Sequence, residues 1–247
     1  MNMIHDMTYA REWNESAMYF QEQGIYDWLA EQVDGFTTIL ELGCGTGQST
    51  LALFNRKHNV IAVDKNPKCL DLAEDKLQDF YKSDKGMMSS ETVPVKFVEA
   101  DYTDGSFTKQ FLPHLSVDAI VCWNVGTAGD AKILKDYEEL WKYFGYSQED
   151  AEADPAGVYN RTMCLCACLI GRIVDAPVNI VFRSQTNLTN GIKAECNRIK
   201  DQMNFSEAIF KSRKVTSLSA GGRLLSINNK VTQEETMDLF LISVLFK

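Results

Sequence analysis

The sequence lacks a long apolar run, a dense basic block, an internal repeat and an N-terminal signal for secretion. No run approaches the ~18 apolar residues that span a bilayer, so we expect no membrane partner. Residues 1–6 have neither a charged start nor an apolar segment, which predicts a cytoplasmic protein. The 34 acidic residues outnumber the 25 basic ones, for a formal net charge of −9. Nucleic acid is therefore disfavoured as a partner, because binding to its backbone needs clustered Lys and Arg.

The sequence has only three histidines. It has seven cysteines, an odd number that cannot all pair with one another in disulfides. His58 begins a predicted strand and His114 lies in a predicted loop, so we expect neither to act as a catalytic base; His5 stays undecided. Reduced thiols are the simplest interpretation of the cysteines in a cytoplasmic chain. Three of them alternate within the apolar run 163–170, but alternate residues diverge around a helix and no histidine is near. We expect a core helix here and no metal site.

A glycine-rich turn between a predicted strand and a predicted helix organises the chain. Residues 37–40 are apolar and β-branched, which predicts a buried strand. Residues 48–54 have a helix-forming composition, and Glu41-Leu42-Gly43-Cys44-Gly45-Thr46-Gly47 lies between the two segments. Glycine adopts positive φ and has no Cβ, so the backbone can turn sharply and let a ligand approach. The helix that follows offers free N–H groups at its start.

An acidic residue at the end of the next strand indicates which class of ligand the turn binds. Residues 59–63 form a second predicted strand, and Asp64 follows it 21 positions after Gly43. In a Rossmann-like unit such an acid accepts hydrogen bonds from ribose hydroxyls, so the pattern predicts an adenosine-containing ligand. The dinucleotide fingerprint needs its third glycine at the position of Gln48, whereas this chain has it one residue earlier, at Gly47. That spacing disfavours a nicotinamide dinucleotide.

The run 41–47 resembles the E/D-x-G-x-G-x-G motif of class I S-adenosylmethionine-dependent methyltransferases. Residues 61–64, 97–102 and 117–122 are similar to three further motifs of that family, in the same order and with similar spacing. The resemblance covers residues 36–125 approximately. It implies S-adenosylmethionine as the cofactor and S-adenosylhomocysteine as the product.

The resemblance also implies a role for the motif residues. Glu41 and the glycines would shape the pocket for the methionine end of the cofactor, and Asp64 would hold the ribose. The Asp101 carboxylate would accept the adenine amino group, with the Tyr102 N–H facing a ring nitrogen; a turn cap is the alternative role of Asp101. The implied cofactor-binding residues are Glu41, Gly43, Cys44, Gly45, Gly47, Asp64, Lys65, Asp101, Tyr102 and Trp123. We do not expect Cys44 to be a nucleophile.

The acceptor site is expected where the fourth strand ends and under an N-terminal helical cap. Trp123 and Asn124 follow that strand, at the edge where open α/β sheets bind ligands. The family motif N/D-P-P-Y for base amino groups is absent after Asn124, which disfavours that chemistry. Residues 8–34 predict one or two helices with a break near Gly24, and by the resemblance they form either a packing cap or a lid.

Six residues are the candidates for acceptor chemistry. The candidate catalytic residues are Tyr19, Trp123 and Asn124, and the candidate substrate-binding residues are Tyr9, Trp13 and Arg183. For Arg183, at the end of the fifth strand, a structural salt bridge is the alternative to binding an acidic substrate group.

The whole chain, 1–247, is predicted to form a single domain. Its fold class is α/β: a three-layer Rossmann-like methyltransferase fold with a seven-stranded, mostly parallel sheet, an antiparallel last strand and a helical cap. The parts are 1–35 (cap or lid), 36–128 (cofactor-binding half), 145–162 (possible insertion) and 178–247 (substrate-side half with a terminal β-hairpin). Residues 130–144 are expected to form one helix, and residues 145–158 a polar segment.

The implied reaction transfers the sulfonium methyl group to an oxygen, nitrogen or carbon nucleophile, with a small molecule as the first choice of acceptor. Positioning alone can supply ~7–11 kcal/mol, so the lack of an evident catalytic histidine does not count against it. A general base is needed only if the acceptor must lose a proton. The alternatives are a protein methyltransferase, an NAD(P)-dependent oxidoreductase and a non-catalytic S-adenosylmethionine-binding protein. A monomer or a homodimer is expected.

Overall fold

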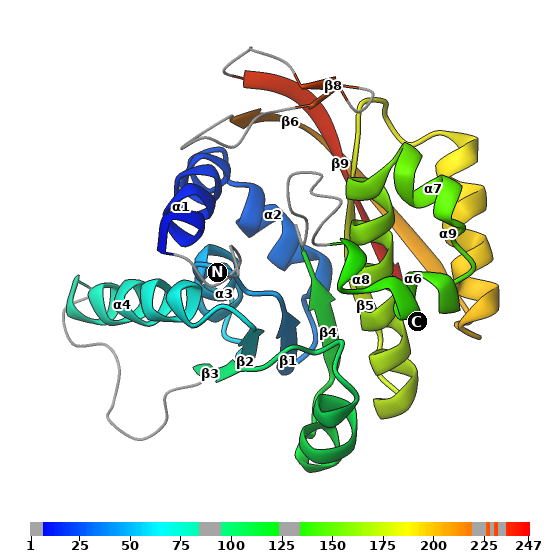
Figure 1. Ribbon diagram of the computed structural model, residues 1–247. Coiled ribbons are helices and arrows are strands. Elements are labelled where there is room, and N and C mark those ends of the chain that lie inside the picture. The colour runs from blue at the N-terminus through cyan, green and yellow to red at the C-terminus, as the bar shows by residue number, and fades with distance from the viewer. Residues whose placement is uncertain (1–6, 84–94, 124–133, 219–225, 228–229, 232–235) are drawn as a thin grey trace.

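Seven strands form one mixed sheet in the computed structural model, which describes residues 7–83, 95–123, 134–218, 226–227, 230–231 and 236–247 (Figure 1). The strands are β1 (Thr38–Leu42), β2 (Asn59–Asp64), β3 (Val95–Glu99), β4 (Ala119–Cys122), β5 (Val178–Ser184), β6 (Ala208–Leu218) and β9 (Thr236–Phe246). Their order across the sheet is β3-β2-β1-β4-β5-β9-β6. β9 is antiparallel to β5 and β6, while β1 to β5 pair in parallel. The predicted sheet is confirmed.

Helices cover both faces of this sheet. They are α1 (Met7–Glu22), α2 (Ile25–Ala30), α3 (Gln48–Asn55), α4 (Pro67–Ser83), α6 (Glu138–Tyr143), α7 (Gln148–Ala153), α8 (Pro155–Val174) and α9 (Asn190–Gln202). Short helical turns are η2 (Glu31–Val33), η3 (Phe107–Phe111) and η4 (Leu112–His114), and β7 (Ser226–Ile227) pairs with β8 (Lys230–Val231). None of the helices in the described part of the chain is long and apolar enough to cross a bilayer.

The sheet separates two hydrophobic clusters, because successive residues of a strand face opposite sides. In β1, Ile39 packs in the cluster that contains residues of α1 to α4, whereas Leu40 packs in the cluster with residues of α6 to α9. All four residues of β4 are buried. Burial on both faces is typical of a central parallel strand, so the unbroken apolar runs of the sequence have their physical reason here.

The strand order reverses beside β1, and this reversal locates the site. β2 and β3 lie on one side of β1, and β4 and β5 lie on the other. Open α/β sheets bind ligands outside the carboxyl ends of the strands at such a switch point. The glycine turn follows β1 and Trp123 follows β4, so both flank the switch point.

The N-terminal cap is fastened to the β6–β9 hairpin, which lies beside it in Figure 1. The Gln23 side chain donates to the carbonyl of Thr216 (2.9 Å) and accepts from its N–H (3.0 Å). The Arg213 guanidinium donates to the carbonyls of Gln23 (2.7 Å) and Gly24 (2.9 Å). Gly24 has φ +64°, which explains why the predicted helix breaks there.

One expectation for the region after β4 needs correction. The expected helix 130–144 is not continuous in its described part, because the chain turns at Asp136 and Tyr137 before α6 begins at Glu138. The segment 145–158, predicted as polar, contains α7 and the start of α8. Its polar residues cap helices: Ser147 and Asp150 form a reciprocal capping box at the start of α7.

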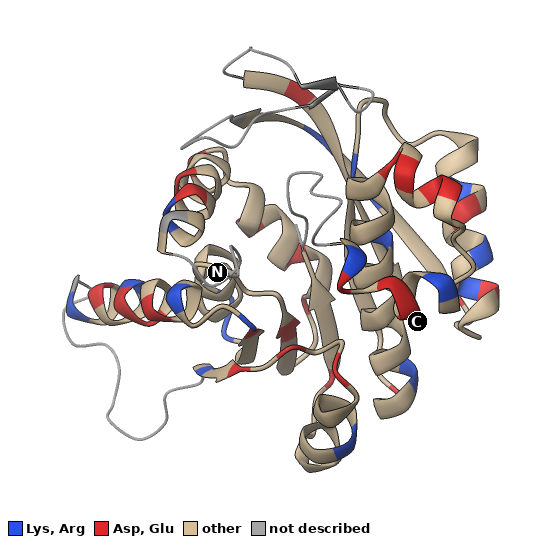
Figure 2. Cartoon of the chain, viewed as in Figure 1, with Lys and Arg blue, Asp and Glu red and all other residues tan. Residues whose placement is uncertain are grey.

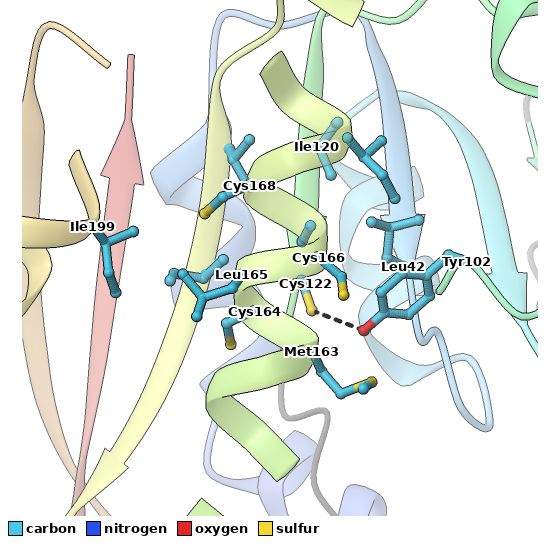
Figure 3. Packing of buried hydrophobic residues seen from close by; sticks show 14 of the residues in the cluster. Leu42, Tyr102, Ile120, Cys122, Met163, Cys164, Leu165, Cys166, Cys168 and Ile199 are labelled. Carbon is cyan, nitrogen blue, oxygen red and sulfur yellow. Dashed lines mark hydrogen bonds between the residues drawn. The ribbon is translucent and has the colours of Figure 1, made fainter. Parts of the chain in front are cut away.

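The alternating cysteines of α8 lie in the core, as predicted (Figure 3). Cys164, Cys166 and Cys168 are all buried in the same cluster as Cys122 of β4. Burial raises the pKa of Cys166 to about 12, so its thiol stays protonated at neutral pH. These cysteines therefore act as small hydrophobic residues between the helix and the sheet.

Candidate active site

Backbone hydrogen bonds fix the glycine turn after β1 against the end of β2. The N–H groups of Gly43 and Cys44 both donate to the carbonyl of Val63, at 2.8 and 3.0 Å. Gly43, Gly45 and Gly47 have φ values of +75°, +54° and +87°, a region that L side chains rarely adopt. The predicted need for glycine in this turn therefore has a conformational basis at all three positions.

Two of these glycines also differ in the space around them. A Cβ added at Gly47 would lie 2.7 Å from the Cβ of Ala73, so this glycine lets α3 approach α4 closely. A Cβ added at Gly45 would meet nothing within 4 Å. Gly45 thus faces open space, as a backbone that contacts a ligand must.

Asp64 joins the end of β2 to this turn. Its Oδ2 accepts the N–H of Gly45 at 2.9 Å, and its Oδ1 accepts the N–H of Asn66 at 2.8 Å. Burial raises the pKa of Asp64, the two backbone N–H groups oppose that rise, and Asp101 adds to it. The side-chain nitrogen of Asn66 is buried and has no hydrogen-bond partner among the described residues. The structure therefore brings an acid and an unpaired donor to the carboxyl end of β2.

Glu41, the acid that opens the motif, is buried beneath the turn. Its Oε2 accepts the hydroxyl of Thr50 at 2.6 Å. Burial raises the pKa of Glu41 to about 7, hydrogen bonds from Ser49 and Thr50 oppose the rise, and Asp64 adds to it. Burial, with Asp64 and Glu41 nearby, also keeps the pKa of Cys44 well above its usual range. The buried Cys44 thiol is thus protonated at neutral pH, in line with the expectation that it is no nucleophile.

A polar cluster at the end of β3 surrounds Asp101. Its Oδ1 accepts from the N–H of Thr103 at 3.0 Å, which is the turn-capping role. Its Oδ2 accepts the hydroxyl of Tyr137 at 3.2 Å and lies 3.7 Å from the ammonium of Lys65. Lys65 also donates to the Tyr137 hydroxyl and stands 4.7 Å from the centre of its ring. One carboxylate oxygen therefore serves the turn, and the other faces the site.

Comparison with known proteins assigns this part of the chain to a family. Residues 39–142 match the profile of the family described as methyltransferase domain. These residues, which include the glycine turn, Asp64 and Asp101, are similar to a methyltransferase domain. The predicted family, fold class, enzyme class and cofactor are thereby confirmed for this part.

The individual proteins that this chain resembles either match only part of it or have low sequence identity. A cypemycin N-terminal methyltransferase from Streptomyces sp. is 34% identical over 98 residues, which is 39% of this chain and 34% of that protein. The chain thus spans about a third of the curated relative it matches. A TehB-like S-adenosylmethionine-dependent methyltransferase from Corynebacterium glutamicum has a TM-score of 0.47 and 14% identity over 98% of this chain and 100% of that one. Magnesium protoporphyrin IX methyltransferase from Synechocystis has a TM-score of 0.43 and 15% identity. This match covers 99% of this chain and 84% of that one.

Two tyrosines of the methyltransferase site were not predicted from the sequence as site residues. Tyr137 bridges Lys65 and Asp101, and its ring packs edge-on against that of Tyr159, with centres 5.4 Å apart. Burial raises the pKa of Tyr159, and Tyr137, Tyr9 and Asp101 add to the rise. Tyr159 of α8 is thereby linked electrostatically to Tyr9 of α1 and to Asp101 after β3. Its sequence context, an early turn of an apolar helix, gives no hint of this position.

The predicted acceptor residues on α1 separate into two groups. Tyr9 and Trp13 form an edge-on aromatic pair with centres 6.1 Å apart, and Tyr9 lies close enough to Tyr159 to influence its pKa. Tyr19 is ten residues beyond Tyr9, which is ~15 Å along a helix. The structure therefore brings Tyr9 and Trp13 together and sets Tyr19 apart from them.

The remaining predicted residues follow β4 and end β5. Trp123 is buried, and its indole N–H donates to Asn179 of β5 at 2.6 Å. The guanidinium of Arg183 stands over the ring of Phe20 of α1, 5.7 Å from its centre. Asn124 lies outside the described residues.

Proposed function

We propose that the protein as a whole is an S-adenosylmethionine-dependent methyltransferase that acts on an oxygen, nitrogen or carbon atom of a small molecule. The observation that carries this proposal is the contact between the Asp64 carboxylate and the N–H of Gly45. It joins the acid at the end of β2 to a glycine turn whose open side faces outward at the switch point of the sheet.

Each side chain has a task in this proposal. Asp64 accepts hydrogen bonds from the ribose hydroxyls, and Asn66 offers its unpaired nitrogen beside them. Asp101 receives the adenine amino group on Oδ2, the oxygen that Tyr137 and Lys65 contact. Gly45 permits close approach of the methionine end, and the buried Glu41 supports the turn from below. Tyr102 and Trp123 complete the set of predicted cofactor residues.

S-adenosylmethionine supplies an electrophilic methyl group on a sulfonium that leaves as a neutral thioether. The chain has to hold an acceptor lone pair in line with the S–CH₃ bond and to exclude water. We assign the walls of that space to Tyr9 and Trp13, an aromatic pair on α1, and to Tyr159 on α8, whose pKa Tyr9 helps to raise. Tyr19 and Arg183 are less directly placed, and we retain them as proposed acceptor residues at its margin.

The position of α1 favours a compact acceptor. The helix is held at its end by Arg213, and in its middle the side chain of Asn14 contacts those of Gln48 (2.8 Å) and Lys76 (3.1 Å). A helix fixed at both places beside the carboxyl edge restricts access by a folded partner. A second candidate acceptor is an amino terminus, favoured by the N-terminal methyltransferase named above.

Calorimetric titration with S-adenosylhomocysteine, NAD and NADP tests the cofactor. We expect the first ligand alone to bind, and Asp64→Asn to weaken its binding by roughly 10–100-fold, as for a lost charged hydrogen bond. Asp71→Asn, on the exposed face of α4, is the matched control and should bind as the wild type does. Preferential binding of NAD or NADP would overturn the proposal.

Labelled S-adenosylmethionine then tests the acceptor. We expect methyl transfer into a fraction of small metabolites when the protein is added. Transfer into a peptide fraction alone would identify the amino-terminal candidate. Binding of the cofactor without transfer to either fraction would favour a non-catalytic binding protein.

A further inference from the structure

The indole of Trp123 is held by a chain of buried polar side chains that crosses the sheet. Its Nε1–H donates to Oδ1 of Asn179 at 2.6 Å. The Nδ2 of Asn179 donates to the hydroxyl of Ser243 on β9 at 2.9 Å, and that hydroxyl lies 3.3 Å from Oδ1. Asn179 and Ser243 are 0% and 1% exposed, so the chain lies within the core.

Asparagine is a poor residue for this position on packing grounds. Asn179 lies in β5, where it pairs with Val121 of β4 on one side and Leu245 of β9 on the other. Parallel strands buried on both faces are normally continuous apolar runs. A buried amide costs free energy unless its groups are paired, whereas valine or leucine would cost nothing of this kind. What the amide provides and an aliphatic side chain cannot is an acceptor for the indole N–H.

The ring so held lies beside the glycine turn. β1 and β4 pair with Glu41 opposite Val121, and Gly43 and Trp123 each follow two residues later. Trp123 also belongs to the same buried cluster as Cys44 of the turn. Trp has a large apolar ring and one polar handle, so a hydrogen bond to that handle fixes the direction of the ring.

We propose that Asn179 and Ser243 are positioning residues, which orient the Trp123 indole as a wall of the pocket at the methionine end of the cofactor. This inference rests on the proposed function. Without the acceptor at Asn179 the buried N–H loses its partner and the ring turns away, so the pocket loses its shape on that side. Ser243 acts through Asn179 by fixing which way the amide faces.

Indole N–H signals in ¹⁵N-labelled protein test the geometry without any acceptor substrate. The signal lost in Trp123→Phe identifies Trp123. We expect this signal to move in Asn179→Leu and, in the wild type, to move on saturation with S-adenosylhomocysteine. An unchanged signal in Asn179→Leu would overturn the hydrogen-bond assignment, and a signal indifferent to the ligand would overturn the placement of the ring.

A double-mutant cycle on S-adenosylhomocysteine affinity tests the positioning role. Asn179→Leu should weaken binding by about tenfold, the size of one lost hydrogen bond, but should have little further effect in a Trp123→Phe background. Ile180→Ala, on the opposite face of β5, controls for lost stability and should bind as the wild type does. Equal losses in both backgrounds, or wild-type affinity in folded Asn179→Leu, would refute the role. Failure of the wild type to bind would instead refute the proposed function and leave the indole signal in Asn179→Leu as a separate result.

Discussion

Replacing Glu41 by glutamine should stabilise the protein at high pH and not at low pH. The carboxyl group is 2% exposed, and burial raises its pKa from its usual 4.5 to about 7. Below pH 4.5 the folded and unfolded chains both carry the proton, so the raised pKa has no effect on stability. Between pH 4.5 and 7 the unfolded chain releases the proton and the folded chain keeps it, so the free energy of unfolding falls as pH rises. Above pH 7 the loss is complete.

The size of this loss follows from the same two values. The interval between 4.5 and about 7 corresponds to a loss of about 3 kcal/mol, at about 1.36 kcal/mol per pH unit, of which about 2–3 kcal/mol accrues between pH 5 and pH 8. Glutamine keeps the volume and an oxygen that can accept the Thr50 hydroxyl, which is bonded at 2.6 Å in the wild type. The difference in the free energy of unfolding between Glu41→Gln and the wild type should therefore grow by about 2–3 kcal/mol, in favour of the variant, from pH 5 to pH 8.

Chemical denaturation of both proteins at pH 5 and pH 8 measures this gain. Glu74→Gln, on the exposed face of α4, a helix that carries both acidic and basic residues (Figure 2), controls for the loss of one negative charge, and the effect of Glu41→Gln should exceed that of this control at pH 8. A Glu41→Gln difference that is the same at both pH values, or that shrinks as pH rises, would refute the reasoning.

Two further substitutions test how the turn and the cap are held. Gly47→Ala should lower the free energy of unfolding by roughly 3 kcal/mol or more, because backbone strain of ~1–2 kcal/mol adds to an overlap with Ala73. Gly35→Ala is the control: this residue has φ +93° but open space around it, so the substitution should cost the strain alone. Equal losses in denaturation would contradict the close approach of α3 and α4. Arg213→Ala removes two hydrogen bonds to backbone carbonyls and should cost ~1–3 kcal/mol. Lys214→Ala breaks only an exposed ion pair and should cost at most ~1 kcal/mol, so equal losses would show that Arg213 does not fasten the cap.

The glycine turn and its acids were predictable because their pattern is local. Strand, turn, helix and acid follow one another within residues 37–64, and each has its own composition and spacing. The break at Gly24 was predictable for the same reason, since a positive φ at one residue ends a helix. The antiparallel hairpin followed from a change in pattern, from alternating helices and strands to strands alone.

The rest of the site depends on contacts between distant segments. Tyr137 lies within the helix predicted for residues 130–144, because Leu134, Tyr137 and Trp141 keep helical spacing across a turn that interrupts the helix. That turn directs the Tyr137 hydroxyl to Asp101, a contact that no local pattern encodes. Asn179 was likewise hidden in an apolar strand. By contrast, α7 carried a recognisable signal, since Ser147 with Asp150 three residues later is the spacing of a capping box.

The neighbouring acids of the site would favour a positively charged group beside them. Asp64 raises the pKa of Glu41, and Asp101 raises that of Asp64, so a neighbouring acid disfavours the charge of both Glu41 and Asp64. Stability alone would favour a neutral side chain at the buried position of Glu41, as the Glu41→Gln prediction implies. A positive group near them would offset this repulsion, and a sulfonium is such a group. The ammonium of Lys65 lies 3.7 Å from Asp101, and its charge also lowers the pKa of Asp64, whereas the groups that act on Glu41 are the hydroxyl donors Ser49 and Thr50 and the acid Asp64. The electrostatic cost is therefore greatest at Glu41, beneath the glycine turn, and a sulfonium bound near this turn would reduce it.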